Sequence, residues 1–140
     1  MLVFIAVHLV ITKSKMDEIL FIISTGLIGM FVDSAFHISG IIIYKSSISN
    51  TIAPLWIIAM WLGFAATVNH SMSWLDRKYI HGLVLGLVFG PLSYVTGEKF
   101  GAISFGDDRF AALAILALAW GIVGPGLYYL NDSYYRIGNQ

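Results

Sequence analysis

The sequence predicts an all-α protein: a polytopic bundle of transmembrane helices with about five apolar segments, the first of them short or truncated. Of the 140 residues, 58% are hydrophobic and only 11% are charged, and the mean hydropathy is +0.81. Soluble domains carry about 25% charged residues, so this chain has too little charge to cover a surface that faces water. Its apolar segments also lack the alternation of apolar and polar residues that is typical of transmembrane barrel strands. Helices that cross a membrane are therefore expected.

The charge balance and the missing cysteines exclude several classes of function. Eight Lys and Arg residues balance eight Asp and Glu residues, and there is no Cys. A protein that binds nucleic acid needs a basic surface to neutralise phosphates, so nucleic acid is not expected as a partner. Without Cys, disulfides, thiolate metal sites and Cys nucleophiles are excluded. The sequence contains neither a serine nucleophile elbow nor an HExxH zinc motif. We therefore predict no catalytic residue, no cofactor and no metal site.

The whole chain, residues 1–140, is predicted to be one integral membrane domain. A helix needs about 20 mostly apolar residues to cross the hydrocarbon core. The apolar segments lie at approximately residues 1–12, 19–44, 52–75, 80–96 and 110–130, and a polar tail covers residues 131–140. Either Asp107 or Asp108 is expected to cap the helix of the last segment, because a carboxylate satisfies free N–H groups and favours the positive end of the helix dipole.

The first segment is too short to cross a membrane. Twelve residues in a helix extend only about 18 Å. The segment also lacks the preceding positive charge and the following cleavage site of a signal peptide. We expect Met1 to lie inside or near a helix whose upstream part is missing from this sequence.

Basic residues in the short loops predict the orientation of the helices. With five crossings, one side of the membrane holds Lys13, Lys15, Arg77, Lys78 and Arg136, and the other holds Lys45, Lys99 and Arg109. Cytoplasmic loops carry the excess of Lys and Arg, which places the C-terminus in the cytoplasm. Tyr44 and Trp56, near predicted span ends, are expected in the interfacial aromatic belts.

Polar residues within the apolar segments form the candidate functional site. In the second segment, one helical stripe carries Gly26, Gly29, Asp33, His37 and Gly40. Asp33 and His37 are separated by four residues, so a hydrogen bond between them is expected to orient the imidazole. The pair is either a proton relay, an ion or metal contact or a headgroup site, or a polar pair that satisfies itself within a packed bundle.

Asn69 and His70 extend this predicted intramembrane polar site into the third segment. Asn and His side chains form hydrogen bonds between membrane helices. A shared metal site of Asp33, His37 and His70 is not favoured. The two histidines differ in height by about 15–20 Å at 1.5 Å per residue, whereas metal ligands lie about 2 Å from the ion.

The fourth and fifth segments carry small residues and prolines. Gly82, Gly86 and Gly90 form a flat face that is predicted to pack closely against another helix, within the chain or in a second copy. Pro91 and Pro125 lack the N–H that a helix needs, so we expect helix kinks at both prolines. Paired broken helices occur at binding sites of transporters, although Pro and Gly are also common in membrane helices generally.

Two stretches of the chain resemble a known family. They are Pro54–Thr67, continuing into Asn69-His70-Ser71, and Gly90-Pro91-Leu92-Ser93-Tyr94 with Gly97 and Gly101-Ala102. Together they resemble a domain-of-unknown-function family of small bacterial inner-membrane proteins. Its members are often encoded beside genes resembling cyclopropane-fatty-acid synthases. The resemblance therefore implies, by association, an accessory role in membrane lipid modification or envelope stress.

Three functions remain open from the sequence. The first is an integral inner-membrane protein that assists lipid modification or the envelope stress response. The second is a small transporter or permease component that uses the Asp33 and His37 stripe, and the third is an intramembrane lipid-modifying enzyme. The expected partners are membrane lipids and either another membrane protein or a second copy of the chain.

Overall fold

The computed structural model describes residues 12, 15–45, 49, 51–68 and 78–137, with side chains as far as residue 134. Within these residues the chain forms four helices and one two-stranded ribbon. In chain order they are α2 (Lys15–Ile38), β1 (Ile42–Tyr44), α3 (Leu55–Val68), α4 (Tyr79–Lys99), β2 (Ile103–Phe105) and α5 (Arg109–Ile137). The predicted helical fold is confirmed for this part of the chain, whereas the predicted first span lies almost entirely outside it.

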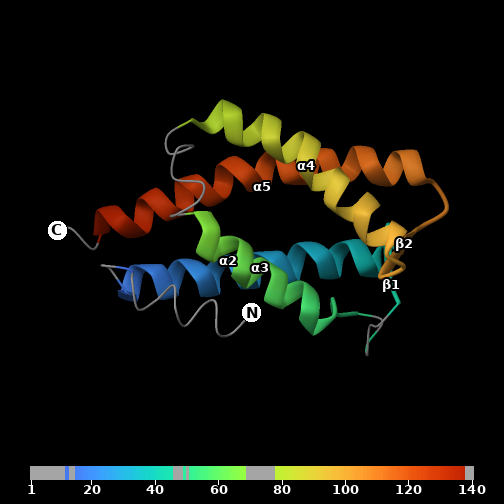
Figure 1. Cartoon of the computed structure of the whole chain (residues 1–140), viewed down its shortest axis with the longest axis horizontal. Helices are drawn as coiled ribbons and strands as arrows, with labels where there is room; N and C mark the ends of the chain where they lie inside the picture. The colour runs from blue at the N-terminus through green and yellow to red at the C-terminus, as the bar shows by residue number, and fades with distance from the viewer. Residues whose placement is uncertain (1–11, 13–14, 46–48, 50, 69–77, 138–140) are drawn as a thin grey trace.

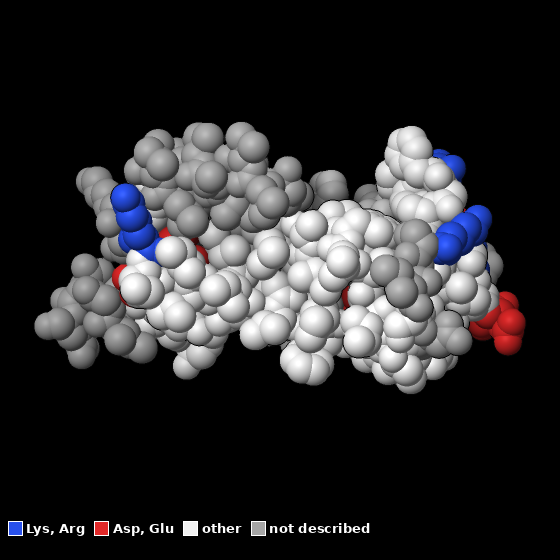
Figure 2. All heavy atoms as spheres, turned by 90° about the horizontal axis from the view of Figure 1, so that it is seen from below, with Lys and Arg blue, Asp and Glu red and all other residues white. Residues whose placement is uncertain are grey.

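Three of these helices are long and apolar enough to cross a membrane. They cover Lys15–Ile38, Tyr79–Lys99 and Arg109–Tyr134, and α3 is a shorter apolar helix. This makes the chain a multi-pass membrane protein. Figure 2 shows the matching charge distribution on one face, where most of the coloured Lys, Arg, Asp and Glu side chains lie near the two ends and very little charge is visible between them. The last four of the five predicted segments correspond to three long helices and one short helix among the described residues.

The four helices associate as two antiparallel pairs. α2 packs along α3, and α4 packs along α5, with fewer contacts between the pairs. The starts of α2 and α4 and the end of α5 lie at one end of the molecule, and the ribbon of β1 and β2 lies at the other (Figure 1). In this ribbon β1 and β2 are antiparallel, with Ile42 opposite Phe105 and Tyr44 opposite Ile103. The ribbon therefore ties α2 of one pair to α4 of the other.

The predicted span 19–44 is wrong at its end, because the helix stops at Ile38. Gly40 takes a φ of 72°, which glycine adopts without steric cost, and its N–H donates to the carbonyl of His37 at 3.1 Å. The end of α4 repeats this arrangement: Gly101 also has a φ of 72°, and its N–H donates to the carbonyl of Glu98 at 2.9 Å. Each glycine ends a helix and turns the chain into one strand of the ribbon.

α5 continues through Pro125 to Ile137 without interruption, and the kink predicted there stays a prediction. α4 likewise remains helical through Pro91, and its ribbon changes direction near the middle (Figure 1). Membrane helices tolerate proline where neighbouring groups satisfy the freed backbone carbonyl. The predicted cap is confirmed at Asp108, whose Oδ1 accepts a hydrogen bond from the N–H of Ala111 at 3.0 Å.

α5 extends into the predicted polar tail because its last turns pack on α2. The hydroxyl groups of Tyr134 and Ser24 form a hydrogen bond of 2.8 Å between the two helices. Tyr128 belongs to the same hydrophobic cluster as Phe21 of α2. Contacts with a neighbouring helix therefore hold a polar segment in helical form that its composition alone does not favour.

Glycines allow the helices of each pair to approach closely. At Gly86, an added Cβ would lie 2.2 Å from the backbone oxygen of Trp120 in α5, and at Gly90 it would lie 2.3 Å from the Trp120 ring. At Gly82 it would lie 3.5 Å from Tyr128, an ordinary contact. The predicted Gly82, Gly86 and Gly90 face thus lies against α5 of the same chain.

Candidate ligand-binding site

Asp33 is a buried carboxylate near the C-terminal end of α2. Its exposed fraction is 0%. Oδ1 accepts hydrogen bonds from the hydroxyl groups of Tyr44 and Tyr94, the latter at 2.5 Å, and Oδ2 accepts one from the indole N–H of Trp61 at 2.6 Å. These donors belong to β1, α4 and α3, so one carboxylate connects four elements. An ionised carboxylate only accepts hydrogen bonds, and all three partners are donors.

The fold around Asp33 explains how these donors reach it. Gly29 lies one turn before Asp33, and an added Cβ there would lie 2.0 Å from Cγ of Trp61. The absence of a side chain at Gly29 therefore allows the Trp61 ring to lie against α2. The turn at Gly40 reverses the chain, and the strand pairing brings Tyr44 back alongside the end of α2.

The pKa of the Tyr44 phenol lies above its ordinary value. Burial is the largest cause, and the charges of Tyr94 and Asp33 and the hydrogen bond to Asp33 act in the same direction. Tyr44 therefore remains protonated at neutral pH and keeps the hydrogen that it donates to Asp33.

Asp33 lies in the wall of a cavity of about 630 Å³ between the two helix pairs. This volume is within the range of about 300–1,000 Å³ that small-molecule pockets occupy. Nine aromatic residues contribute to its lining: Tyr44, Trp56, Trp61, Phe64, Phe89, Tyr94, Phe100, Trp120 and Tyr128. Asp33 is the one charged residue among the described residues that line it. The cavity is thus predominantly apolar and aromatic, with a single acid.

The aromatic side chains of this cavity are packed in defined orientations. The rings of Trp61 and Trp120 are stacked, with centroids 4.7 Å apart and an interplanar angle of 6°. Phe64 contacts both rings edge-on, at 6.3 Å and 5.9 Å. This cluster joins α3 to α5 behind the carboxylate, and it fixes the Trp61 ring whose N–H binds Asp33.

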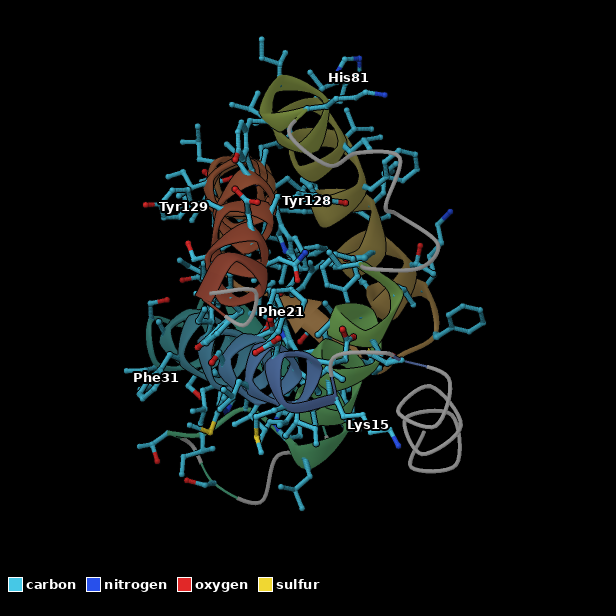
Figure 3. All side chains as sticks on the ribbon, turned by 90° about the vertical axis from the view of Figure 1, so that its left-hand side faces the viewer. Lys15, Phe21, Phe31, His81, Tyr128 and Tyr129 are labelled. Atoms are coloured by element: carbon cyan, nitrogen blue, oxygen red, sulfur yellow. The ribbon has the colours of Figure 1, made fainter. Side chains whose placement is uncertain are left out.

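Two polar groups in the cavity lining lack ordinary hydrogen bonds within the described residues. The Trp120 N–H lies near the Tyr94 hydroxyl, and the Tyr128 hydroxyl is buried without a partner among the described residues. Figure 3 shows Tyr128 on the side of α5 that faces α4, whereas Tyr129 points away. A bound molecule with an acceptor or donor group would satisfy the Tyr128 hydroxyl.

A comparison with protein families accounts for most of the chain. The sequence pattern of a family of proteins of unknown function, DUF2878, matches residues 1–126. The chain belongs to the DUF2878 family. No curated protein and no solved structure matches it. The matched range includes Asp33 and its three hydrogen-bond donors.

In this DUF2878 protein, His37 does not form the predicted hydrogen bond with Asp33. Its Nδ1 lies 3.2 Å from the carbonyl oxygen of Ile42, and its Nε2 lies 3.3 Å from the carbonyl oxygen of Ser49. The turn after α2 places these carbonyls beside the ring, while the Asp33 carboxylate is occupied by Tyr and Trp donors. Among the described residues, Tyr44 links His37 to Asp33: the His37 ring contacts the Tyr44 ring edge-on, with centroids 5.5 Å apart.

The other two residues of the predicted polar site, Asn69 and His70, lie outside the described residues of the DUF2878 chain. Within the described ranges, no group of three His, Asp or Glu side chains could hold a metal ion. Of the two described residues of that predicted site, Asp33 lines the cavity and His37 does not.

The sequence reasoning missed the three donors to Asp33. Tyr44 was expected in an interfacial belt, but its hydroxyl binds Asp33 instead. Trp61 and Tyr94 lie within apolar segments, where a buried indole or phenol needs a hydrogen-bond partner. A buried indole and phenol in the same membrane domain as Asp33, an acid that also needs partners, could have indicated that these groups bind one another.

Proposed function

We propose that this DUF2878 protein binds a hydrophobic small molecule in the cavity between its helix pairs, as a small membrane transporter or permease component. The observation that carries the proposal is the apolar cavity of about 630 Å³ with Asp33 in its wall. This resembles ordinary ligand pockets, which are mostly apolar with a few placed polar groups. The Asp33 hydrogen-bond network replaces the Asp33 and His37 pair as the centre of the site.

The edge of the cavity supports entry from the lipid phase. Met60 of α3 and Phe89 of α4 line the cavity, yet they are 51% and 61% exposed. Phe100, just after α4, also lines it and is largely exposed. Since α3 and α4 make few contacts with each other, these apolar side chains form an edge between two helix pairs that faces hydrocarbon. A molecule dissolved in the bilayer would reach the cavity without crossing water.

The proposed location is the inner membrane of a bacterium, with the end of α5 in the cytoplasm. Lys45, Lys99 and Arg109 all lie close in sequence to the ribbon, which puts that end of the molecule outside. Lys15 begins α2 and Lys78 directly precedes α4, and both lie at the end of the molecule opposite the ribbon. The predicted excess of basic residues at this opposite end supports the orientation.

The experiment is to purify the protein in mild detergent and identify co-purified hydrophobic molecules by mass spectrometry. We expect about one bound molecule per chain. Met60→Trp would fill the edge of the cavity and lower this occupancy. Val84→Trp is the matched control, because Val84 is 50% exposed on α4 and does not line the cavity. Empty wild-type protein, or equal losses in both variants, would contradict the proposal.

An accessory role in membrane lipid modification is the second candidate, with membrane lipids as partners. It is favoured by the same lipid-facing edge at Met60 and Phe89, through which an acyl chain could enter. Lipidomics of a strain that lacks the gene separates the two candidates. An altered acyl-chain profile supports the accessory role, and an unchanged profile contradicts it. An intramembrane enzyme, the third hypothesis, has no specific support from the cavity lining.

A further inference from the structure

We propose that the molecule held in this cavity is an organic cation: a hydrophobic amine or quaternary ammonium compound. The inference rests on the proposed function, because it specifies the ligand class of the same cavity. It is drawn from the charge of Asp33, the chemistry of the surrounding aromatic wall and the lack of oxygen ligands for an inorganic ion.

The first argument is charge complementarity. None of the described residues that line the cavity is Lys, Arg or His. Arg109, at the start of α5, forms a salt bridge with Glu98 at 2.8 Å. The Asp33 carboxylate thus accepts hydrogen bonds from three neutral donors, and none of the described lining residues is a cation that could neutralise its charge. A positive ligand would supply the missing charge in surroundings that screen charges weakly.

The second argument is the set of aromatic side chains that surround Asp33 in the cavity wall. The carboxylate itself has no exposed surface, so a ligand would first contact the side chains that donate to it. Donation to an anion polarises the hydroxyl groups of Tyr44 and Tyr94, which leaves electron-rich oxygen atoms. The faces of Trp and Tyr rings attract cations as well. The wall therefore presents a negative potential although it is made of neutral side chains.

The third argument excludes inorganic cations and anions. Calcium takes six to eight oxygen ligands and magnesium takes near-octahedral oxygen coordination, whereas both oxygens of Asp33 already accept hydrogen bonds. An anion beside the Asp33 carboxylate would need positive charge to offset the repulsion, and the described lining holds neither Lys nor Arg. The apolar aromatic lining suits the apolar groups of a ligand, and the buried acid suits a positive charge on the same ligand.

The experiment uses three probes of nearly equal size and shape but different charge. Tetraphenylphosphonium is positive, tetraphenylsilane is neutral and tetraphenylborate is negative. Binding to the full-length protein in lipid nanodiscs is measured by calorimetry, with empty nanodiscs as the reference. Quenching of tryptophan fluorescence gives a second readout, because Trp56, Trp61 and Trp120 line the cavity. We expect the dissociation constant of the phosphonium probe to be at least tenfold lower than that of the silane, and the borate to bind most weakly.

The outcomes separate this inference from the proposed function. Equal affinities for the cationic and neutral probes would overturn the organic-cation inference and leave a hydrophobic-binding cavity in place. Absence of binding by all three probes would contradict both. Preference for the borate would overturn the inference directly.

Two variants locate the charge that discriminates between the probes. Asp33→Asn should reduce the preference for phosphonium over silane at least fivefold. Asp107→Asn, the same change at an exposed position before α5, should leave the preference unchanged. If Asp33→Asn does not fold, the three probes on the wild-type protein still decide the inference. A folded Asp33→Asn variant with an unchanged preference would contradict it.

Discussion

The indole N–H of Trp61 donates a hydrogen bond of 2.6 Å to Oδ2 of Asp33. This bond joins the middle of α3 to α2 at a point where both side chains are buried. It gives the one donor for Oδ2 among the residues that the structure describes. The bond therefore stabilises the packing of α2 against α3. It is also one of the three hydrogen bonds that hold the Asp33 carboxylate in the cavity wall.

Trp61→Phe should destabilise the protein by about 2 kcal/mol, because a hydrogen bond to a charged group is lost and an acceptor remains buried. Unfolding by increasing SDS in mixed micelles, followed by circular dichroism, measures this free energy. Trp120→Phe is the control, since it removes the other half of the stacked pair without taking a donor from Asp33. Equal losses in both variants would show that ring volume, rather than the hydrogen bond, is responsible.

Gly29→Ala should destabilise the α2 and α3 pair by about 1–3 kcal/mol through overpacking. The new methyl group would lie 2.0 Å from Cγ of a Trp61 ring that is fixed by Trp120 and Asp33. Gly126→Ala has nothing within 4 Å of the added atom and gains helix propensity, so its stability should stay equal or rise. Thermal unfolding of both variants in the same detergent tests the difference.

Gly86→Ala should separate α4 from α5 more severely than Gly82→Ala. The added atom would lie 2.2 Å from the backbone oxygen of Trp120, which cannot rotate away as a side chain can. At Gly82 the nearest atom belongs to Tyr128 at 3.5 Å. We expect Gly86→Ala to lower the melting temperature and the yield of folded protein, with Gly82→Ala close to wild type. A similar effect of both changes would contradict the close approach at Gly86.

High pH should destabilise the protein through Tyr44. Its pKa is raised in the folded protein, so its contribution to stability is complete below the unfolded pKa of about 10. That contribution is lost as the pH rises above this value, since the unfolded phenol then ionises more readily than the folded one. The ionisable neighbours of Tyr44 are Asp33, Tyr94 and His37. Unfolding measured from pH 8 to 11 should show a steeper loss for wild type than for Tyr44→Phe; parallel curves would contradict this.

Tyr128→Phe should leave stability unchanged or increase it. The buried hydroxyl has no partner within the described residues, so its removal abolishes a desolvated polar group. Tyr129→Phe, at a position that is 69% exposed on the opposite side of α5 (Figure 3), is the control. A loss of stability specific to Tyr128→Phe, measured by thermal unfolding, would mean that this hydroxyl has a structural role.

Much of the helical architecture follows from local patterns in the sequence. The predicted segments 80–96 and 110–130 lie within the long helices α4 and α5, because runs of apolar residues of this length read as membrane helices wherever they occur. The cap at Asp108 was predictable because it is also a local feature: it depends only on the backbone of the next three residues. Gly40 could have been recognised as a helix end, but the apolar residues that follow it made the predicted span 19–44 look continuous.

The candidate site depends on contacts between distant parts of the chain. Asp33 was identifiable as an unusual residue, because an acid in an apolar segment demands a partner. Its neighbour His37, four residues later, was the obvious local partner and proved to be the wrong one. Tyr44, Trp61 and Tyr94 are separated from Asp33 by 11, 28 and 61 positions along the chain, and no periodicity encodes which of them meet.

By itself, the sequence determined that these side chains belong in hydrocarbon, that they form helices, and that one acid stands within them. These properties depend on the transfer free energy and the local backbone geometry of each segment. Only the tertiary structure decided that β1 and β2 pair, that Asp33 binds three aromatic donors rather than His37, and that a cavity lies beside it. Those features arise from packing between helix pairs, where hydrogen bonds and steric fit select among many arrangements of the same helices.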